Sequence, residues 1–369
     1  MYISSISPVH VRPELDRMAS YIPGESLETF SARTGIPIQN LIKLNSNESP
    51  YGPPPQVLRA LSNHENYNNY PDTDSTLLKR ALSEYIGVAD QHIVVSHGSN
   101  ELINLLWHIF LSVGDNIICC PPTFSLYTFI TTFCGAYVLE VPRTLDYDVD
   151  VASILAALTP ETKMIVLCSP NNPTGNPICE EDVLTLLETG RIVVVDEAYV
   201  EFSNNRRGLA HLVPLHRNLI VMRTFSKWAG LAGLRIGYGI FPEWIVTYMR
   251  RAQCPFEVNV AGHIAAIETL NHLDYTLANV RRIVQERERL FEVLSNQPYL
   301  EPMLSQGNFI LSRLRDEEVK MERIREVVES YGLLLRYFNH PYLHNFLRVT
   351  VGLPEHTDKL ELALQQVLR

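Results

Sequence analysis

The sequence predicts an α/β protein built on a mostly parallel sheet that helices cover on both faces. Seven short apolar runs rich in β-branched residues lie between residues 93 and 240, and helical patterns separate several of them. Strands that are apolar on both faces and alternate with helices are typical of such a sheet. Because these sheets bind ligands outside the carboxyl ends of their strands, we expect the chemistry there.

The order of the predicted elements divides the chain into two parts. The seven strands are predicted at 93–96, 116–120, 136–141, 163–168, 191–195, 219–223 and 235–240. Helices are predicted between them at 100–112, 125–134, 149–158 and 180–189. Beyond Pro255 the pattern predicts a helix from about 258, a long charged helix at 274–297, strands near 308–312, 333–336 and 347–351, and helices at 317–331 and 356–368.

The length of 369 residues also favours two domains, because a single core stops growing at roughly 250–300 residues. We expect a large domain at 46–275 and a smaller αβ domain at 276–369. The first 45 residues are rich in Pro and Gly, so we expect them to be irregular and to join the smaller domain as an N-terminal arm. The second domain is therefore predicted to be discontinuous.

Composition excludes several classes of partner and site. The net charge of −10 argues against nucleic acid or an anionic membrane as the main partner. The N-terminus lacks a signal-peptide pattern, and the apolar stretch 102–113 is too short to span a bilayer. Six cysteines without a CxxC pair favour reduced, buried thiols in the cytoplasm. His340 and His344 have helical spacing, but Pro341 breaks a helix there, so no metal site is expected.

Three polar segments follow apolar runs, where the sheet should bind its ligand. Asp196 ends one run, and Tyr199 follows three residues later. Lys227 follows the next run and stands eight residues before Arg235, among glycines that let a backbone approach an anionic ligand. Residues 169–175 follow a third run and contain two Asn and two Pro. Alone, these segments are also explained as a helix cap or as a turn.

The ordered set of segments resembles the fold-type-I pyridoxal-phosphate enzymes. The resemblance implies that Lys227 forms a Schiff base with the cofactor aldehyde, which requires its pKa to fall from about 10.4. It implies that Asp196 pairs with the ring nitrogen and keeps it protonated, so that the ring accepts electrons. The remaining implied contacts are hydrogen bonds to the phenolic oxygen from Tyr199 and Asn172, and phosphate contacts from Ser226 and Arg235.

Two further segments complete the implied cofactor site. The turn at 96–101 opens a helix, and by resemblance it is a phosphate loop that presents Ser99 and carries Asn100 where a carboxylate is common. Phe124 aligns with the aromatic residue that stacks on the pyridine ring, although tyrosine is commoner there. A core phenylalanine is the alternative interpretation of Phe124.

Motifs along nearly the whole chain resemble the histidinol-phosphate aminotransferase group within that family. They lie at residues 11–13, 21–24, 44–53, 69–72, 335–338 and 346–352. The resemblance implies a ping-pong reaction of L-histidinol phosphate with 2-oxoglutarate, which yields imidazole-acetol phosphate and L-glutamate. It also implies a homodimer, because Tyr70 matches a tyrosine that reaches the cofactor phosphate of the neighbouring subunit.

The same resemblance assigns the substrate contacts. Arg348 is the main anchor, and Arg336 and Tyr21 help to bind the phosphate. A planar guanidinium binds a carboxylate or a phosphate with two hydrogen bonds, so one anchor can serve both substrates in turn. A surface ion pair is the alternative role for either arginine.

Two departures from the group leave the substrate open. Trp228 stands where a small residue or another aromatic is usual and is expected to narrow the pocket, and Glu257 stands where asparagine is common. Transamination of aromatic amino acids therefore remains an alternative, and threonine-phosphate decarboxylases share the cofactor motifs. A DNA-binding regulator with this fold would need a basic helix-turn-helix segment, which residues 1–45 do not offer.

Overall fold

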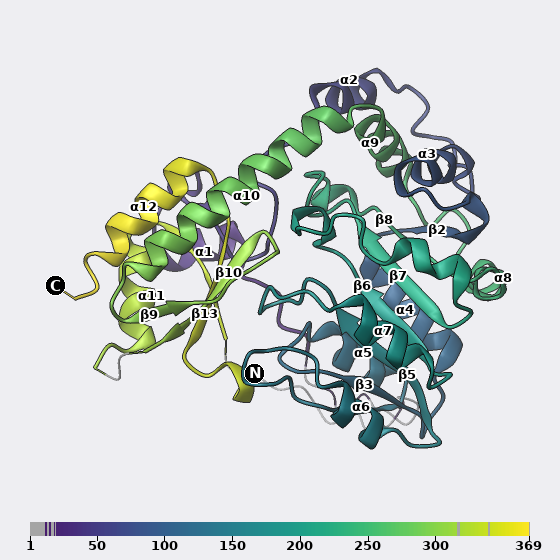
Figure 1. Ribbon diagram of the computed structural model, residues 1–369. Helices are drawn as coiled ribbons and strands as arrows, with labels where there is room; N and C mark the ends of the chain where they lie inside the picture. The colour runs from purple at the N-terminus through teal and green to yellow at the C-terminus, as the bar shows by residue number, and fades with distance from the viewer. Residues whose placement is uncertain are drawn as a thin grey trace, which may run out of the picture.

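The computed structural model describes residues 12, 15, 18, 20–315, 318–338 and 340–368. Its largest sheet has seven strands in the order β2-β8-β7-β6-β5-β3-β4 (Figure 1). Only β8 runs antiparallel to its two neighbours, so the predicted mostly parallel sheet is confirmed. The strands are β2 (Ile93–Ser96), β3 (Asn116–Cys119), β4 (Tyr137–Glu140), β5 (Thr162–Cys168), β6 (Ile192–Asp196), β7 (Leu219–Thr224) and β8 (Gly237–Ile240).

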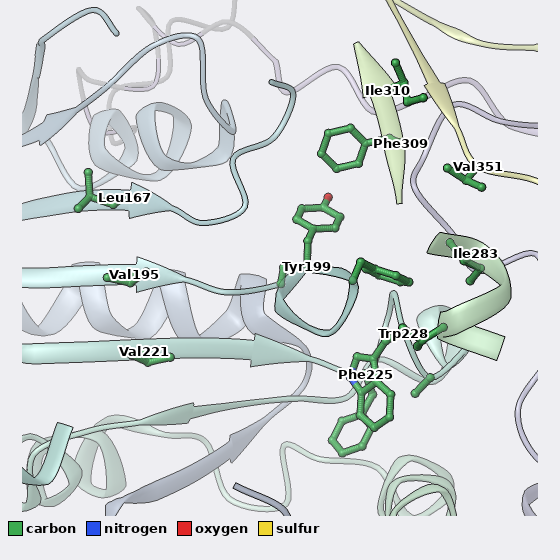
Figure 2. Close-up of a cluster of buried hydrophobic side chains, with 14 of the residues drawn as sticks. Leu167, Val195, Tyr199, Val221, Phe225, Trp228, Ile283, Phe309, Ile310 and Val351 are labelled. Carbon is green, nitrogen blue, oxygen red and sulfur yellow. The ribbon is translucent and has the colours of Figure 1, made fainter. Parts of the chain in front are cut away.

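The central strands are buried on both faces because successive side chains point to opposite sides of the sheet. Val193 and Val195 on β6 belong to one hydrophobic cluster, and Val194 between them belongs to the other. Figure 2 shows Leu167, Val195 and Val221 in the first cluster on the neighbouring strands β5, β6 and β7. This double burial explains the continuous apolar runs in the sequence.

Helices cover both faces of the large sheet. One cluster joins the sheet to α4 (Ser99–Phe110), α5 (Leu126–Phe133) and α8 (Glu243–Ala252). The other joins the opposite face to α3 (Thr76–Ile86), α6 (Val151–Ala157), α7 (Glu180–Leu187) and α9 (Val260–Asn271), and α2 (Pro55–Asn63) packs on α9. The predicted helices at 100–112, 125–134, 149–158 and 180–189 are thus present, each slightly shorter than predicted, and the first begins one residue earlier, at Ser99.

The helix α10 (Leu273–Ser295) leads from α9 to a second group of elements (Figure 1). Its antiparallel sheet has the order β12-β13-β10-β9. The strands are β9 (Leu300–Pro302), β10 (Phe309–Leu314), β12 (Arg336–Tyr337) and β13 (Phe346–Thr350), accompanied by α11 (Met321–Ser330) and α12 (Pro354–Leu364). Short 3-10 helices occur at η2 (Ile38–Asn40), η3 (Asp90–His92), η4 (Val200–Phe202), η5 (Ala210–Leu215), η6 (Ala232–Leu234) and η7 (Pro341–Leu343).

The N-terminal segment is more regular than the sequence analysis predicts. It contains α1 (Leu27–Thr34), whose first turn is capped by Ser26 and which ends at Gly35 in the left-handed region. It also contains β1 (Ile42–Lys43), which pairs in parallel with β11 (Leu333–Leu334). The expectation of irregular structure is therefore wrong for Leu27–Thr34, where serine and glycine cap a helix, and for Ile42–Lys43.

Two predictions for the C-terminal third also need correction. The strand predicted at 333–336 is two short strands, β11 and β12, which belong to different sheets. The helix predicted from 317 begins at Met321, and residue 317 itself lies outside the described residues. Among the described residues, no helix has the length and apolar character needed to cross a membrane.

Candidate active site

A cavity of about 1000 Å³ opens at the carboxyl ends of the parallel strands. Its walls come from the loops after β5, β6 and β7, from the start of α4, and from β12 and β13. All of the predicted site residues except Tyr70 line it, namely Tyr21, Ser99, Asn100, Phe124, Asn172, Asp196, Tyr199, Ser226, Lys227, Arg235, Arg336 and Arg348. The structure therefore brings together residues that lie more than 300 positions apart in the sequence.

Lys227 lies three residues beyond the end of β7 and is partly exposed to the cavity. Its Nζ donates a hydrogen bond to the backbone oxygen of Ser46 at 2.9 Å. Burial and the nearby charges of Arg348 and Arg235 lower the pKa of Lys227 to about 8. A larger fraction of this amine is therefore neutral near neutral pH than of a solvent-exposed lysine, which makes it a better nucleophile and proton acceptor.

Asp196 is the last residue of β6, and its side chain is almost fully buried. One carboxylate oxygen, Oδ2, accepts a hydrogen bond from the Tyr127 hydroxyl at 2.8 Å. The other, Oδ1, accepts one from the backbone N–H of Ala198 at 3.1 Å. Burial raises the pKa of Asp196 to about 6, against the effect of both hydrogen bonds. The carboxylate is thus fixed in direction and mostly ionised at neutral pH.

Tyr199 points its hydroxyl group into a polar cluster, while its ring packs edge-on to Phe309 with the centroids 5.0 Å apart (Figure 2). The hydroxyl oxygen accepts hydrogen bonds from Asn47 Nδ2 at 3.1 Å and from Asn172 Nδ2 at 3.3 Å. Burial raises the pKa of Tyr199 further above its usual value. Because the hydroxyl oxygen already accepts two bonds, its proton is available to an acceptor in the cavity.

The start of α4 and Arg235 form the cationic end of the cavity. Ser99 is the first residue of α4, where backbone N–H groups lack intrahelical partners, and the exposed Asn100 follows it. Arg235 Nη1 lies 3.3 Å from the Ser226 hydroxyl. Gly98 has φ +88, and a Cβ there would lie 2.6 Å from Arg235 Nη2. This close packing of a helix start, a hydroxyl and a guanidinium suits a phosphate group.

Arg348 and Arg336 bring two further cations to the cavity from β13 and β12. Arg348 is buried, and it donates to Asn172 Oδ1 at 2.6 Å and to the Asn45 carbonyl at 2.7 Å. Its Nε has no hydrogen-bond partner among the described residues. Burial, together with the charge of Arg336, lowers the pKa of Arg348 to about 10. Each terminal nitrogen of Arg348 carries a second N–H, and an anion in the cavity that Arg348 lines would accept from these groups.

The contacts of Arg336 and Tyr21 are weaker. Arg336 Nη1 is 3.3 Å from the carbonyl oxygen of Pro23, and its guanidinium lies 6.0 Å from the ring centroid of Phe338. Tyr21 is 38% exposed, and its ring meets Phe129 edge-on at 5.8 Å. Both side chains can therefore turn toward a ligand at small cost in lost contacts.

Tyr70 lies on the surface and does not line the cavity of its own chain. It is 80% exposed, and its ring stacks on Phe256 with the centroids 4.4 Å apart. The expected role of Tyr70 in a neighbouring subunit stays a prediction.

The two departures noted in the sequence lie outside the cavity. Trp228 is 1% exposed and packs against Phe225 and Tyr85 in the core, so the expectation that it narrows the pocket is wrong. The reason is that its side chain belongs to the hydrophobic cluster drawn in Figure 2 and does not line the cavity. Glu257 accepts a hydrogen bond from His97 N at 2.8 Å and another from the Ser96 hydroxyl, so it supports the turn before α4.

Sequence reasoning gave no role to several residues that hold the site. Asn45, Ser46 and Asn47 contact Arg348, Lys227 and Tyr199 respectively. They belong to a recognised motif at 44–53, but their partners are far away in the chain. Tyr127 contacts Asp196 and lies three residues after Phe124, which was the available signal for placing it at the same end of α5.

The fold places a lysine of lowered pKa in one cavity with three arginines, and comparison with known proteins gives the class of the protein. Residues 39–364 match the family described as aminotransferase class I and II. The chain belongs to this family.

Similar proteins narrow the comparison within the family. The histidinol-phosphate aminotransferase of Roseiflexus castenholzii is 42% identical over 364 residues, which cover 97% of this chain and 98% of that protein. The chloroplastic histidinol-phosphate aminotransferase 1 of Arabidopsis thaliana is 43% identical over 358 residues, with 96% and 85% covered. These similarities confirm the predicted resemblance to histidinol-phosphate aminotransferases.

Solved structures show the same fold at lower identity. The histidinol-phosphate aminotransferase of Sinorhizobium meliloti, in complex with pyridoxal-5'-phosphate, has a TM-score of 0.88 at 24% identity and 99% coverage of both chains. The L-threonine-O-3-phosphate decarboxylase of Porphyromonas gingivalis has a TM-score of 0.77 at 22% identity, covering 89% of this chain and 99% of that one. The fold alone therefore does not separate these two activities.

Proposed function

We propose that the chain is a pyridoxal-phosphate-dependent aminotransferase that converts L-histidinol phosphate and 2-oxoglutarate into imidazole-acetol phosphate and L-glutamate in histidine biosynthesis. The observation that carries the proposal is the position of Lys227 and the buried cation Arg348 on one cavity. The 42% identity to a histidinol-phosphate aminotransferase over nearly the full length supports this choice of substrate.

The residues present fit the cofactor at both of its ends. Ser99, Ser226 and Arg235 would hold the phosphate, where Gly98 leaves no room for a Cβ beside the Arg235 guanidinium. Asp196 would place a negative charge at the ring nitrogen from the opposite wall. The remaining ring contacts would come from Phe124 on the ring face and from Tyr199 and Asn172 at the phenolic oxygen.

Pyridoxal phosphate supplies an aldehyde that joins the substrate amine and a ring that accepts electrons when the Cα–H bond breaks. Lys227 would hold this aldehyde and then take the proton from the substrate Cα. Its pKa of about 8 leaves part of the amine neutral at physiological pH, as a proton acceptor must be. Ser46, which accepts a hydrogen bond from Nζ at 2.9 Å, orients the amine.

Arg348 would bind the anionic end of either substrate. L-Glutamate presents an α-carboxylate there, whereas L-histidinol phosphate presents a phosphomethyl group at the same position. Both anions accept two parallel hydrogen bonds from a guanidinium, so one residue serves both halves of the reaction. Arg336 and Tyr21 are partly free at the cavity mouth and would add contacts to the larger phosphate.

A substrate comparison tests the proposal and its two alternatives. The cofactor-loaded protein is given histidinol phosphate, phenylalanine, tyrosine or O-phosphothreonine, each with 2-oxoglutarate, and glutamate and CO2 are measured. We expect glutamate at the highest kcat/KM with histidinol phosphate and no CO2. A higher kcat/KM with phenylalanine or tyrosine would instead indicate an aromatic amino-acid aminotransferase. Release of CO2 in proportion to the O-phosphothreonine consumed would indicate a threonine-phosphate decarboxylase.

We also propose a homodimer in which Tyr70 of each subunit completes the site of the other. The exposed Tyr70 ring, stacked on Phe256 and outside its own cavity, supports this arrangement. A cytoplasmic location is proposed with it, since all six cysteines are unpaired and four of them are buried.

The proposed domains are 46–275 for the cofactor and 1–45 with 276–369 for the smaller unit. The pairing of β1 with β11 supports joining the N-terminal arm to the C-terminal third.

A further inference from the structure

Tyr127 is buried beneath the wall of the cavity and does not line it. Its ring lies near that of Trp107 on α4, with the centroids 6.3 Å apart. Thr131 fixes the backbone of this turn, because its hydroxyl donates to the Tyr127 carbonyl at 2.7 Å and accepts from Trp107 Nε1 at 2.8 Å. Tyr127, the second residue of α5, is therefore held firmly against α4.

From this position Tyr127 touches two residues that the proposed function assigns to the cofactor ring. Its hydroxyl donates to Asp196 Oδ2 at 2.8 Å, inside the protein and away from water. Its ring meets Phe124 edge-on, with the centroids 5.5 Å apart and the planes at 89°. One buried side chain thus connects the carboxylate at the ring nitrogen with the aromatic group at the ring face.

We propose that Tyr127 is a positioning residue for the cofactor ring, which it serves by orienting Asp196 through its hydroxyl and Phe124 through its ring. The inference rests on the proposed function, since it concerns the same cofactor. A hydrogen bond from a hydroxyl to a buried carboxylate is short and strong, and it stabilises the ionised form. The geometry assigns the two parts of the tyrosine separate effects, and the hydroxyl can be removed while the ring is kept.

If Tyr127 acts through the Asp196 carboxylate, its loss should change the pH dependence of cofactor binding. A role in packing alone would not change it. The Tyr127 hydroxyl works against burial, which raises the pKa of Asp196 to about 6. Without that hydroxyl the carboxyl would accept a proton at still higher pH, and the neutral form could not attract a protonated ring nitrogen. Asp196 also interacts electrostatically with four other titratable groups, Cys168, Glu197, Tyr199 and Lys227.

The test is a titration of cofactor-free protein with pyridoxal phosphate, without substrate, at pH 8 and pH 6. Tyr127→Phe removes the hydroxyl and keeps the ring. Tyr299→Phe is the matched control, because Tyr299 is equally buried and its hydroxyl donates to the Leu364 carbonyl at 2.7 Å, away from the cavity. We expect Tyr127→Phe to weaken binding about tenfold at pH 8 and by a larger factor at pH 6, with Tyr299→Phe unchanged at both.

A second pair of variants shows whether the Tyr127 hydroxyl acts through the Asp196 carboxylate or only through packing. In an Asp196→Asn background, adding Tyr127→Phe should change the cofactor affinity by less than about twofold, because no carboxylate is left to orient. Equal affinities for Tyr127→Phe and Tyr299→Phe, or a full tenfold loss in the Asp196→Asn background, would overturn the inference. Failure of the unmodified chain to bind the cofactor would instead overturn the proposed function.

Discussion

Arg348 is a buried cation that lines the cavity, and this combination supports its proposed role as an anion anchor. Two of its nitrogens donate to Asn172 and to the Asn45 carbonyl, while Nε has no partner among the described residues. A buried cation without a counter-charge costs free energy, and a bound anion lowers that cost. The proposed substrates, L-histidinol phosphate and L-glutamate, both carry an anionic group that would provide this counter-charge.

Replacement of this anchor should affect both half-reactions. We expect Arg348→Gln to lower kcat/KM about 100-fold for histidinol phosphate and for glutamate alike, because each loses charge-assisted hydrogen bonds to the same group. Steady-state kinetics with each substrate measure the effect. Arg313→Gln is the control, since Arg313 pairs with Glu301 on the surface of β10. A loss confined to one substrate would contradict a shared anchor.

Glu201 is a buried carboxyl group that the proposed reaction does not use. It is 2% exposed, and neither of its oxygens has a hydrogen-bond partner among the described residues. Burial raises the pKa of Glu201 from 4.5 to about 8 in the folded protein. The folded state therefore holds this proton more tightly than the unfolded state, and the free energy of unfolding falls as the pH rises from about 4.5 to about 8.

Glu201→Gln should remove this pH-dependent loss of stability. We expect the substitution to raise the free energy of unfolding little at pH 5 and by roughly 2 kcal/mol or more at pH 9, because glutamine cannot ionise. Thermal or denaturant unfolding at the two pH values measures it. Glu188→Gln, which changes an exposed carboxylate at the end of α7, should leave the pH dependence as it is. Parallel stability curves for Glu201→Gln and the unmodified chain would refute the expectation.

At the scale of elements, the turn before α4 depends on two close approaches. Gly98 lies against the Arg235 guanidinium, and a Cβ at Gly237 would lie 2.5 Å from the backbone nitrogen of Ser99. Glu257 holds the same turn through His97 N. The start of α4 is therefore fixed from three sides before any phosphate binds to it.

Gly98→Ala should disturb this turn specifically. The new Cβ would lie 2.6 Å from Arg235 Nη2 and force the guanidinium away, so we expect pyridoxal phosphate to bind at least about tenfold more weakly. Gly114→Ala is a matched control, because Gly114 also has a positive φ but a Cβ there would meet no atom within 4 Å, and Gly114 does not line the cavity. Both variants carry backbone strain. Equal cofactor affinity for the two variants would contradict the role of Gly98.

Strands that correspond to a continuous apolar run were predictable from the sequence. The strands β5, β6 and β7 agree with the predicted runs to within one residue at each end, because double burial leaves a continuous apolar run. The strands β11 and β12 were not separable, since β11 is defined by its pairing with β1, far away in the chain. Pairing between distant segments leaves no periodic signal in either one.

The same distinction applies to the candidate site. Lys227, Asp196 and Asn172 were predictable because each follows the end of an apolar run. Asn47 was not, because its hydrogen bond to Tyr199 spans 152 residues. Tyr127 is similar, since its bond to Asp196 spans 69 residues and its ring looks like an ordinary core residue of an apolar helix.

At the scale of the whole molecule, residues from both sheets line the large cavity. In the proposed dimer, each subunit also contributes a residue to the cavity of the other. Lys227 lies on the side of the seven-stranded sheet, whereas Arg348 lies on β13 of the four-stranded sheet, and both line the cavity of one chain. Tyr70 does not line that cavity and is exposed for contact with a second copy. These positions predict different outcomes when defective chains are mixed.

Mixing Lys227→Ala chains with Tyr70→Ala chains tests the shared site. A hybrid dimer contains one site with an intact lysine and an intact tyrosine, so random reassociation should restore about a quarter of the unmodified activity. The control mixes Lys227→Ala with Arg348→Gln, which are defects in one cavity, and should restore nothing. The measurement is activity after unfolding and refolding the chains together. No recovery in the first mixture would contradict the proposed exchange of Tyr70.

Lys227 is proposed to hold the cofactor, and reduction of the loaded protein with borohydride tests this role most directly. Reduction fixes the cofactor to the amine that carries it, and peptide mass spectrometry locates that amine. We predict a pyridoxyl group on the peptide containing Lys227 and none in the Lys227→Ala chain. A pyridoxyl group on another lysine, with Lys227 unmodified, would contradict the account.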